Sequence, residues 1–160
     1  MPTTEIRPAH AGDSALILRF ITDLAIYENA GDAVVATEND IRQSLFAPEA
    51  TAQAVICEID SRAAGFAVYF FNYSTWLGKN GLYLEDLYVS PEFRGLGAGK
   101  ALLKHLAEIA VARNCGRLEW SVLDWNEPAI GFYQSLGARP QDEWVAYRLS
   151  DKALVDLAES

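Results

Sequence analysis

The sequence predicts an α/β fold in which helices flank a central mixed β-sheet. Two observations predict it. The middle of the chain holds three runs rich in β-branched and aromatic residues, which is typical of strands. Segments before and after these runs place apolar residues at helical spacing, and turn residues separate the two kinds of segment. In chain order the expected elements are β-α-α-β-β-β-α-β-α-β, a pattern that forms a sheet covered by helices.

The first third of the chain is expected to contain a short strand and two helices. The strand lies at Glu5–Pro8, and Asp13 is placed to cap a helix that ends before Gly31. The apolar residues of this helix recur at helical spacing, at Leu16, Phe20, Leu24 and Tyr27. Thr37 is followed three residues later by Asp40, which resembles a capping box and predicts a second, short helix.

Three strands and a long helix follow. The strand-like runs are Thr51–Ile59, Ala63–Tyr73 and Leu82–Val89, with turn residues between them. Ser90-Pro91 ends the third run. After a glycine-rich turn, apolar residues at helical spacing predict a helix over Ala98–Arg113.

The C-terminal part is expected to contain two more strands and one helix. Leu118–Leu123 is typical of a strand. Asn126-Glu127-Pro128 opens a helix, because proline is tolerated in a first turn, and Gly137 closes it. Trp144–Leu149 is expected to form a last strand before a short tail.

Composition excludes several classes of protein. The chain has 160 residues, so we expect a single domain over residues 1–160 with its core at about 4–150. With 13 basic and 22 acidic residues the formal net charge is −9, which disfavours nucleic-acid binding. There is no apolar run long enough for a membrane and no secretion signal, so we expect a cytoplasmic protein without membrane contact. The two cysteines and two histidines lack metal-ligand spacing, so no metal site is expected.

A short cationic segment lies inside this acidic chain. Residues 94–117 hold five basic residues and one acidic residue, whereas the flanking parts are both acidic. The segment begins with a loop that contains Gly95, Gly97 and Gly99, between a strand and a helix. Glycine lets the backbone approach a ligand closely, and a helix start offers unpaired N–H groups. The segment therefore predicts an anion site, most often one for phosphate.

The glycine spacing in this loop matches neither a P-loop nor a dinucleotide fingerprint. A glycine-rich turn without a ligand is the alternative interpretation. The basic residues Arg94 and Lys100 and the local positive charge favour the anion site.

The loop also carries a family resemblance. Arg94-x-x-Gly97-x-Gly99 resembles the Q/R-x-x-G-x-G/A signature of the GCN5-related N-acetyltransferase (GNAT) superfamily, in the strand–loop–helix context that this signature requires. Further stretches resemble its diamine acetyltransferase branch, which acts on spermidine, spermine or thialysine: Tyr27-Glu28, Ser74-Thr75-Trp76, Tyr83-Leu84-Glu85-Asp86, Asp124-Trp125-Asn126, Phe132-Tyr133 and Gly137-Ala138. The resemblance covers residues 4–150 and implies the acyl-CoA N-acyltransferase fold, with acetyl-CoA as co-substrate.

The resemblance implies which residues hold acetyl-CoA. Its pyrophosphate would lie on the backbone of the loop formed by Arg94, Gly95, Leu96, Gly97, Ala98, Gly99 and Lys100. Its pantetheine arm would pair like an extra strand with the end of the preceding strand, formed by Leu87, Tyr88 and Val89. Asn126 would contact the arm. From the residues alone, Arg94 could instead be a solvated loop residue and Asn126 a helix N-cap.

The resemblance also implies which groups move protons. Tyr133 matches the general acid that protonates the departing thiolate, and it lies two helical turns from Asn126 on the same expected face. Glu85 matches a substrate-contacting glutamate and would assist deprotonation of the amine, directly or through water. From the residues alone, Tyr133 could be a packed aromatic residue and Glu85 a solvated carboxylate.

A primary amine substrate arrives as a cation, because its unperturbed pKa is about 10.4. The resemblance places Tyr27, Glu28, Trp76 and Asp86 around this cation, together with Glu85. Because Glu85 and Asp86 are adjacent on an expected strand, we expect their side chains to point to opposite faces of the sheet.

These observations predict direct acetyl transfer from acetyl-CoA to a primary amine of a small cationic molecule, without a metal or a covalent intermediate. A diamine, polyamine, thialysine or lysine-like acceptor fits the branch. Another amine class, such as an antibiotic or a protein N-terminus, a non-catalytic acyl-CoA-binding module and a nucleotide-phosphate cradle are the alternatives. The resemblance also implies a homodimer.

Overall fold

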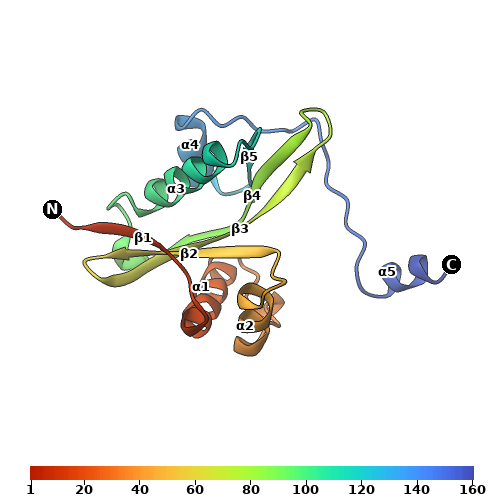
Figure 1. Cartoon of the computed structure of the whole chain (residues 1–160), viewed down its shortest axis with the longest axis horizontal. Helices are drawn as coiled ribbons and strands as arrows, with labels where there is room; N and C mark the ends of the chain where they lie inside the picture. The colour runs from red at the N-terminus through yellow and green to blue at the C-terminus, as the bar shows by residue number, and fades with distance from the viewer. The chain divides into compact units, whose positions relative to one another are not determined.

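The computed structural model describes residues 1–160 (Figure 1). The chain divides into two compact units, Met1–Ser121 and Val122–Ser160. The first unit holds the sheet and three α-helices, and the second holds two α-helices. The expectation of a single domain over the whole chain stays a prediction.

A five-stranded mixed sheet forms the centre of the first unit, as the sequence predicts. Its strands are β1 (Thr4–Pro8), β2 (Ala52–Ile59), β3 (Arg62–Ser74), β4 (Lys79–Val89) and β5 (Leu118–Glu119). They lie in the order β1-β2-β3-β4-β5, with antiparallel pairing from β1 to β4 and parallel pairing of β4 with β5. The central strands need no long connections because β2, β3 and β4 form consecutive hairpins.

Helices cover both faces of this sheet. Figure 1 shows α1 (Ser14–Tyr27) and α2 (Glu38–Phe46) on one face and α3 (Ala98–Ala112) on the other. Three short 3-10 turns lie between these elements, at Ala11–Asp13, Gly31–Ala33 and Pro91–Phe93. In the second unit the helices are α4 (Glu127–Ser135) and α5 (Asp151–Ala158).

The core beneath α1 is built from aromatic and aliphatic side chains. Ile17 and Phe20 of α1 are fully buried against Phe66 of β3, and the two phenylalanine rings stack with their centroids 5.3 Å apart. The ring of Tyr88 in β4 joins the same cluster, with its centroid 6.1 Å from that of Phe20. This packing fixes the end of β4 beneath α1, which matters for the site.

The two expected helix caps have different outcomes. The capping box at Thr37 is confirmed: its hydroxyl accepts a hydrogen bond from the Asp40 N–H at 3.1 Å, and its own N–H donates to the Asp40 carboxylate at 2.9 Å. Asp13 occupies the expected N-cap position of α1, but its side chain makes no capping hydrogen bond. The Asp13 carboxylate instead accepts two hydrogen bonds from the Arg7 guanidinium and one from the His10 N–H. Because Arg7 offers a charged two-donor fork, it holds the carboxylate and lowers the Asp13 pKa.

The C-terminal expectations also need correction. The strand expected at Leu118–Leu123 is limited to Leu118–Glu119, and Trp144–Leu149 forms no strand. A strand needs a neighbour that accepts and donates its backbone hydrogen bonds, and the second unit contains no strand. The expected tail contains α5, which an ion pair between Lys152 and Asp156 supports at i,i+4 spacing.

None of the helices has the length and apolar character that crossing a lipid bilayer requires.

Candidate active site

The end of β4 has a backbone edge without a neighbouring strand. β5 pairs with β4 only at Leu82 and Tyr83, opposite Leu118 and Glu119. Residues 84–89 continue β4 beyond this pairing, so the sheet opens between the two strands. Backbone groups along such an edge can pair with an extended ligand in the manner of an added strand.

The β4 groups that face this edge follow from the pairing with β3. The Ser90 N–H donates to the Ala64 carbonyl at 2.8 Å, so these two residues form a hydrogen-bonded pair. Because such pairs alternate with non-hydrogen-bonded pairs in an antiparallel ladder, Val89 and Leu87 belong to the second kind. Their N–H and C=O groups therefore point away from β3, toward the open edge. Leu87 and Val89 are two of the three strand residues that the family resemblance assigns to the cofactor arm.

Glu85 lies at a β-bulge. In the register with β3, Leu84 lies opposite Tyr69 and Asp86 lies opposite the next residue, Val68, so Glu85 is the extra residue. A bulge interrupts the alternation of side chains and re-aims the residues around it. The expectation that Glu85 and Asp86 point to opposite faces is therefore wrong in its premise, because regular alternation does not hold between them.

The carboxylates of Glu28 and Glu85 lie within electrostatic reach of Asp86 in β4. Asp86 lies opposite Val68, which belongs to the core cluster beneath α1, so the two side chains share that face of the sheet. Burial, together with the negative charges of Glu85 and Glu28, raises the pKa of Asp86 to about 6. Burial also raises the pKa of Glu28, which directly follows α1. The cluster concentrates negative charge that could hold an ammonium group.

The loop before α3 is shaped by its glycines. Gly95 and Gly97 have φ angles of +80° and +84°, which favour glycine, and Gly97 occupies the N-cap position of α3. A Cβ atom added at Gly95, Gly97 or Gly99 would meet no atom within 4 Å. The space beside all three glycines is therefore open to a ligand. The first-turn N–H groups of α3 have no partner within the helix, which makes this helix start suitable for an anion.

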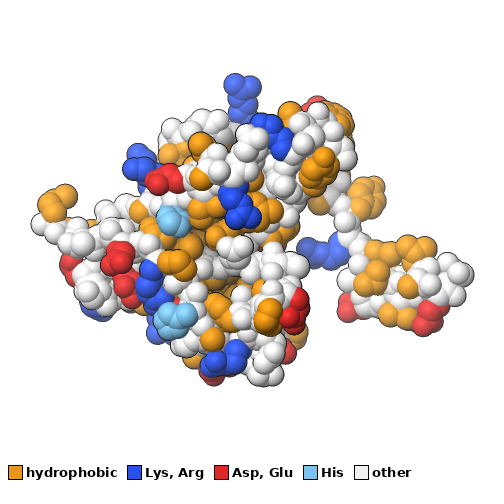
Figure 2. Space-filling view, in the orientation of Figure 1, with side chains coloured by type: hydrophobic (Ala, Val, Ile, Leu, Met, Phe, Trp, Pro, Cys, Tyr) orange, Lys and Arg blue, Asp and Glu red, His pale blue; other side chains and the backbone are white.

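The other residues of the loop divide between buried and exposed positions. Ala98 is buried, whereas Leu96 and Lys100 are exposed. In Figure 2, Lys and Arg side chains lie on and around the part of the molecule where Figure 1 places α3. The positive charge that the sequence places in this segment is thus on the surface, where it can attract an anion.

The Arg94 side chain contacts the end of β4 and the end of α1. Its Nε donates a hydrogen bond to the Val89 carbonyl at 3.1 Å. Its guanidinium carbon lies 5.5 Å from the centroid of the Tyr27 ring and 5.8 Å from that of the Tyr88 ring. Arg94 therefore joins the loop to β4 and to the end of α1, and its expected contact with phosphate stays a prediction.

The structure brings most of the expected acceptor residues together and separates one. Tyr27 ends α1 and is 42% exposed, next to Glu28. Trp76 lies in the turn between β3 and β4, 85% exposed, at the opposite end of β4 from Asp86. At about 3.3 Å per strand residue, this end lies roughly 20 Å from the carboxylates. The assignment of Trp76 to the acceptor site receives no support from this position within the unit.

The second unit carries Asn126 and Tyr133. Asn126 occupies the N-cap position of α4, but its side chain makes no capping hydrogen bond. Its carbonyl accepts from the Ile130 N–H at 3.0 Å, as in a first helical turn. Tyr133 lies two turns further along α4, beside the ring of Phe132 at 5.8 Å. The expected roles of Asn126 with the cofactor arm and of Tyr133 as general acid stay predictions.

The apolar pattern of β4 contains a signal for the bulge, which an assumption of regular alternation along the strand overlooks. The apolar residues of β4 follow alternate positions at Leu82 and Leu84, and then at Leu87 and Val89. The step from Leu84 to Leu87 shifts this pattern by one residue. All four lie opposite odd-numbered residues of β3, so the shift in the pattern marks the inserted residue.

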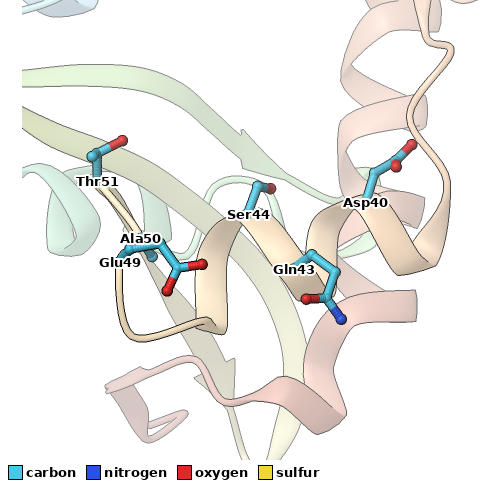
Figure 3. A pocket seen from close by; sticks show the side chains of 6 residues that line it. All are labelled: Asp40, Gln43, Ser44, Glu49, Ala50 and Thr51. Carbon is cyan, nitrogen blue, oxygen red and sulfur yellow. The ribbon is translucent and has the colours of Figure 1, made fainter.

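A hollow of about 470 Å³ lies elsewhere, beside α2 (Figure 3). It is lined by Asp40, Gln43, Ser44, Glu49, Ala50 and Thr51. These residues come from α2 and from the segment that leads to β2. None of them is an expected site residue, and Asp40 is already engaged in the cap of α2.

Sequence comparisons agree with the resemblance. A family model described as the acetyltransferase (GNAT) family matches residues 23–138. The chain is 38% identical to a thialysine N-epsilon-acetyltransferase from Sus scrofa over 169 aligned residues, which cover 99% of both chains. It is 37% identical to a human protein named spermidine/spermine N(1)-acetyltransferase-like protein 1, over 96% of this chain and 24% of that protein. An L-ornithine N5-acetyltransferase from Arabidopsis thaliana is 44% identical over 95 residues, 59% of this chain and 42% of that protein.

Solved structures show the same architecture. An integron cassette protein from the mobile metagenome of V. cholerae superposes with a TM-score of 0.82 at 31% identity, over 98% of both chains. An aminoglycoside acetyltransferase from a soil metagenomic sample superposes with a TM-score of 0.76 at 14% identity, over 93% of this chain and 97% of that one. The second likeness concerns the fold alone.

Proposed function

Because the chain belongs to the acetyltransferase (GNAT) family, we propose that it transfers the acetyl group of acetyl-CoA to a primary amine of a small cationic molecule, of the thialysine, lysine-like or diamine class. One observation carries this proposal: the same segment of β4 offers a backbone edge that no strand pairs with and an adjacent cluster of three carboxylates. The edge suits an amide-bearing cofactor arm, and the carboxylates suit an ammonium group.

The chain offers a fitting surface for acetyl-CoA. When bound, this co-substrate supplies an acyl group activated as a thioester. Leu87 and Val89 would hold its arm through their backbone groups, and the start of α3 would hold its phosphates through N–H groups. The open space beside Gly95, Gly97 and Gly99 allows phosphate to approach the backbone. Lys100 adds positive charge there, and Asn126 is assigned to the arm by the resemblance.

Glu28, Glu85 and Asp86 would hold the ammonium group and receive its proton. At pH 7 a carboxyl group with a pKa of about 6 is mostly ionised, yet it accepts a proton more readily than an ordinary aspartate. Asp86 is therefore a second candidate for the base beside Glu85, which is more exposed and could act through water. Tyr27 would form one wall of this site. Tyr133 would protonate the departing thiolate, and no metal is required.

The cluster of carboxylates restricts which chemical class of amine can be the acceptor. Several negative charges in one place favour a molecule with more than one positive charge, or a cation held close to its reacting amine. Two of the three relatives named above are named for thialysine and ornithine, which carry an amine at the end of a short chain. We assign the same chemical class to the acceptor of this chain.

A homodimer in the cytoplasm completes the proposal. Apolar side chains are uncovered on α5, where Figure 2 shows them in orange, and Leu154, Val155 and Leu157 are each more than half exposed. Tyr147 in the preceding segment is 96% exposed. Burial of such residues against a second copy would stabilise a dimer. Size-exclusion chromatography with light scattering tests this part, and a monomer at micromolar concentration would contradict it.

The decisive experiment mixes the protein with acetyl-CoA and a panel of amines and measures release of free thiol. The panel contains thialysine, lysine, ornithine, diamines, polyamines, an aminoglycoside and a peptide with a free N-terminus. We expect the highest kcat/KM among the first five classes. A preference for the aminoglycoside or the peptide would replace the proposed acceptor, and acetyl-CoA binding without thiol release from any amine would indicate a non-catalytic module.

Two variants test the assigned proton roles in the same assay. Tyr133→Phe removes the phenolic proton and should lower kcat with little effect on acetyl-CoA binding. Glu85→Gln removes a negative charge and should lower kcat/KM for the amine. Glu49→Gln is the matched control, because Glu49 is an exposed carboxylate beside α2. Full activity of Tyr133→Phe would remove only the general-acid assignment.

A further inference from the structure

Hydrogen bonds hold both the backbone and the side chain of Arg94 in place. Its backbone N–H donates to the Pro91 carbonyl at 3.2 Å and closes the short turn that buries Phe93. Its side chain reaches back to β4, where Nε donates to the Val89 carbonyl. The direction of this side chain thus follows from a structured turn and a charged hydrogen bond.

The hydrogen-bond acceptor of Arg94 lies on the edge that the cofactor arm would use. The Val89 carbonyl points away from β3, toward the open side of β4. The same guanidinium lies over the ring of Tyr27, whose neighbour Glu28 contributes to the carboxylate cluster. One side chain therefore contacts both the cofactor edge and the acceptor side of the candidate site.

Resting on the function proposed above, we propose that Arg94 is a positioning residue that fixes the end of β4 against the end of α1, and so aligns the cofactor arm with the acceptor amine. Its effect acts through the Val89 carbonyl and the Tyr27 ring, and it does not require the phosphates. A residue that only binds phosphate would act solely on cofactors that carry phosphate. The two roles therefore differ in their dependence on the cofactor.

The test compares acetyl-CoA with S-acetylpantetheine, which keeps the thioester and the amide-bearing arm but has no phosphate. We expect Arg94→Gln and Arg94→Lys to lower kcat/KM about tenfold with both acyl donors, since each loses the Nε hydrogen bond to the Val89 carbonyl and the guanidinium over the Tyr27 ring. Lys100→Gln is the comparison, and it should weaken the reaction with acetyl-CoA but not with S-acetylpantetheine. Loss restricted to acetyl-CoA in the Arg94 variants would overturn the proposal.

A double-mutant cycle with acetyl-CoA gives a second, independent measurement. Tyr27→Leu removes the ring beneath the guanidinium, so the effects of Tyr27→Leu and Arg94→Gln on kcat/KM should be non-additive by about threefold or more. Additive effects would overturn the proposal even where S-acetylpantetheine is a poor donor. Unchanged thermal unfolding of the variants separates positioning from loss of the fold. Absence of thiol release by the wild-type protein with every amine would instead contradict the proposed function itself.

Discussion

The carboxylate of Asp86 in β4 lies within electrostatic reach of Glu28, the residue that follows α1. The two residues are far apart in the sequence, and the packing of α1 on the sheet brings them together. Glu85 adds a third charge from the bulge. This relationship yields predictions about pH and stability that a set of isolated surface acids would not.

The affinity for the amine should change near the pKa of Asp86. Above about pH 6 this group is ionised and attracts an ammonium ion, whereas below about pH 6 it is neutral. KM for the amine should therefore fall as the pH rises through about 6, and Asp86→Asn should flatten this part of the profile. Steady-state kinetics from pH 5 to 8 provide the measurement. An identical inflection in wild type and variant would assign it to another group.

Asp86→Asn should also stabilise the fold at neutral and alkaline pH. The folded-state pKa of about 6 lies above the ordinary value of 3.8, so folding favours the protonated form. The stability that protonation supports is complete below pH 4 and is lost as the pH rises through about 6. Removing the charge should recover up to about 3 kcal/mol at pH 8 and little at pH 4. Thermal unfolding at the two pH values measures the difference, and equal shifts at both would refute the prediction.

Gly97 and Gly99 should respond differently to alanine. Gly97→Ala places a side chain at a φ of +84° and should destabilise the fold by about 1–2 kcal/mol. Gly99→Ala meets no protein atom and replaces glycine in a helix, so the fold should keep or gain stability. Its new methyl group nevertheless occupies space beside the loop, and acetyl-CoA should bind more weakly. Unfolding curves and calorimetric titration with acetyl-CoA separate the two effects; unaltered affinity of Gly99→Ala would place the phosphates elsewhere.

Thr37→Ala should weaken the fold without affecting catalysis. The change removes the hydroxyl that caps α2 and should cost about 1 kcal/mol. This cap belongs to a helix that contributes no residue to the proposed site, so kcat and KM should stay at wild-type values below the unfolding transition. Denaturant unfolding and the thiol-release assay check both statements. A change in KM would mean that α2 contributes to the site.

Much of the first unit could be predicted from the sequence because its elements carry local signals. The three central strands, α3 and the cap at Thr37 all follow patterns within a few residues of one another. Asp13 was assigned to the wrong hydrogen bonds because its partner Arg7 is brought near by a turn that has no pattern of its own. The strand expected at Trp144–Leu149 required a partner strand, which a local pattern cannot supply.

The loop of the candidate site could be predicted from the sequence, whereas the burial and arrangement of its acidic residues could not. Gly95 and Gly97 adopt positive φ angles, which favour glycine, and their spacing in the sequence predicts the loop. The burial of Asp86 depends on how α1 packs, which sequence alone does not specify. Trp76 followed from resemblance rather than from any pattern, and the hairpin carries it to the far end of β4.

The bulge adds one residue to β4 within the candidate site. Replacing Glu85 changes one side chain, but deleting it would return the strand to regular alternation. Asp86 would still lie opposite Val68 and Leu87 opposite Ala67, because Glu85 is the one residue here without a partner in β3. One inserted residue thus adds an acid and a local bend to the strand at the place where its peptide edge becomes open, and the register on both sides of it is kept.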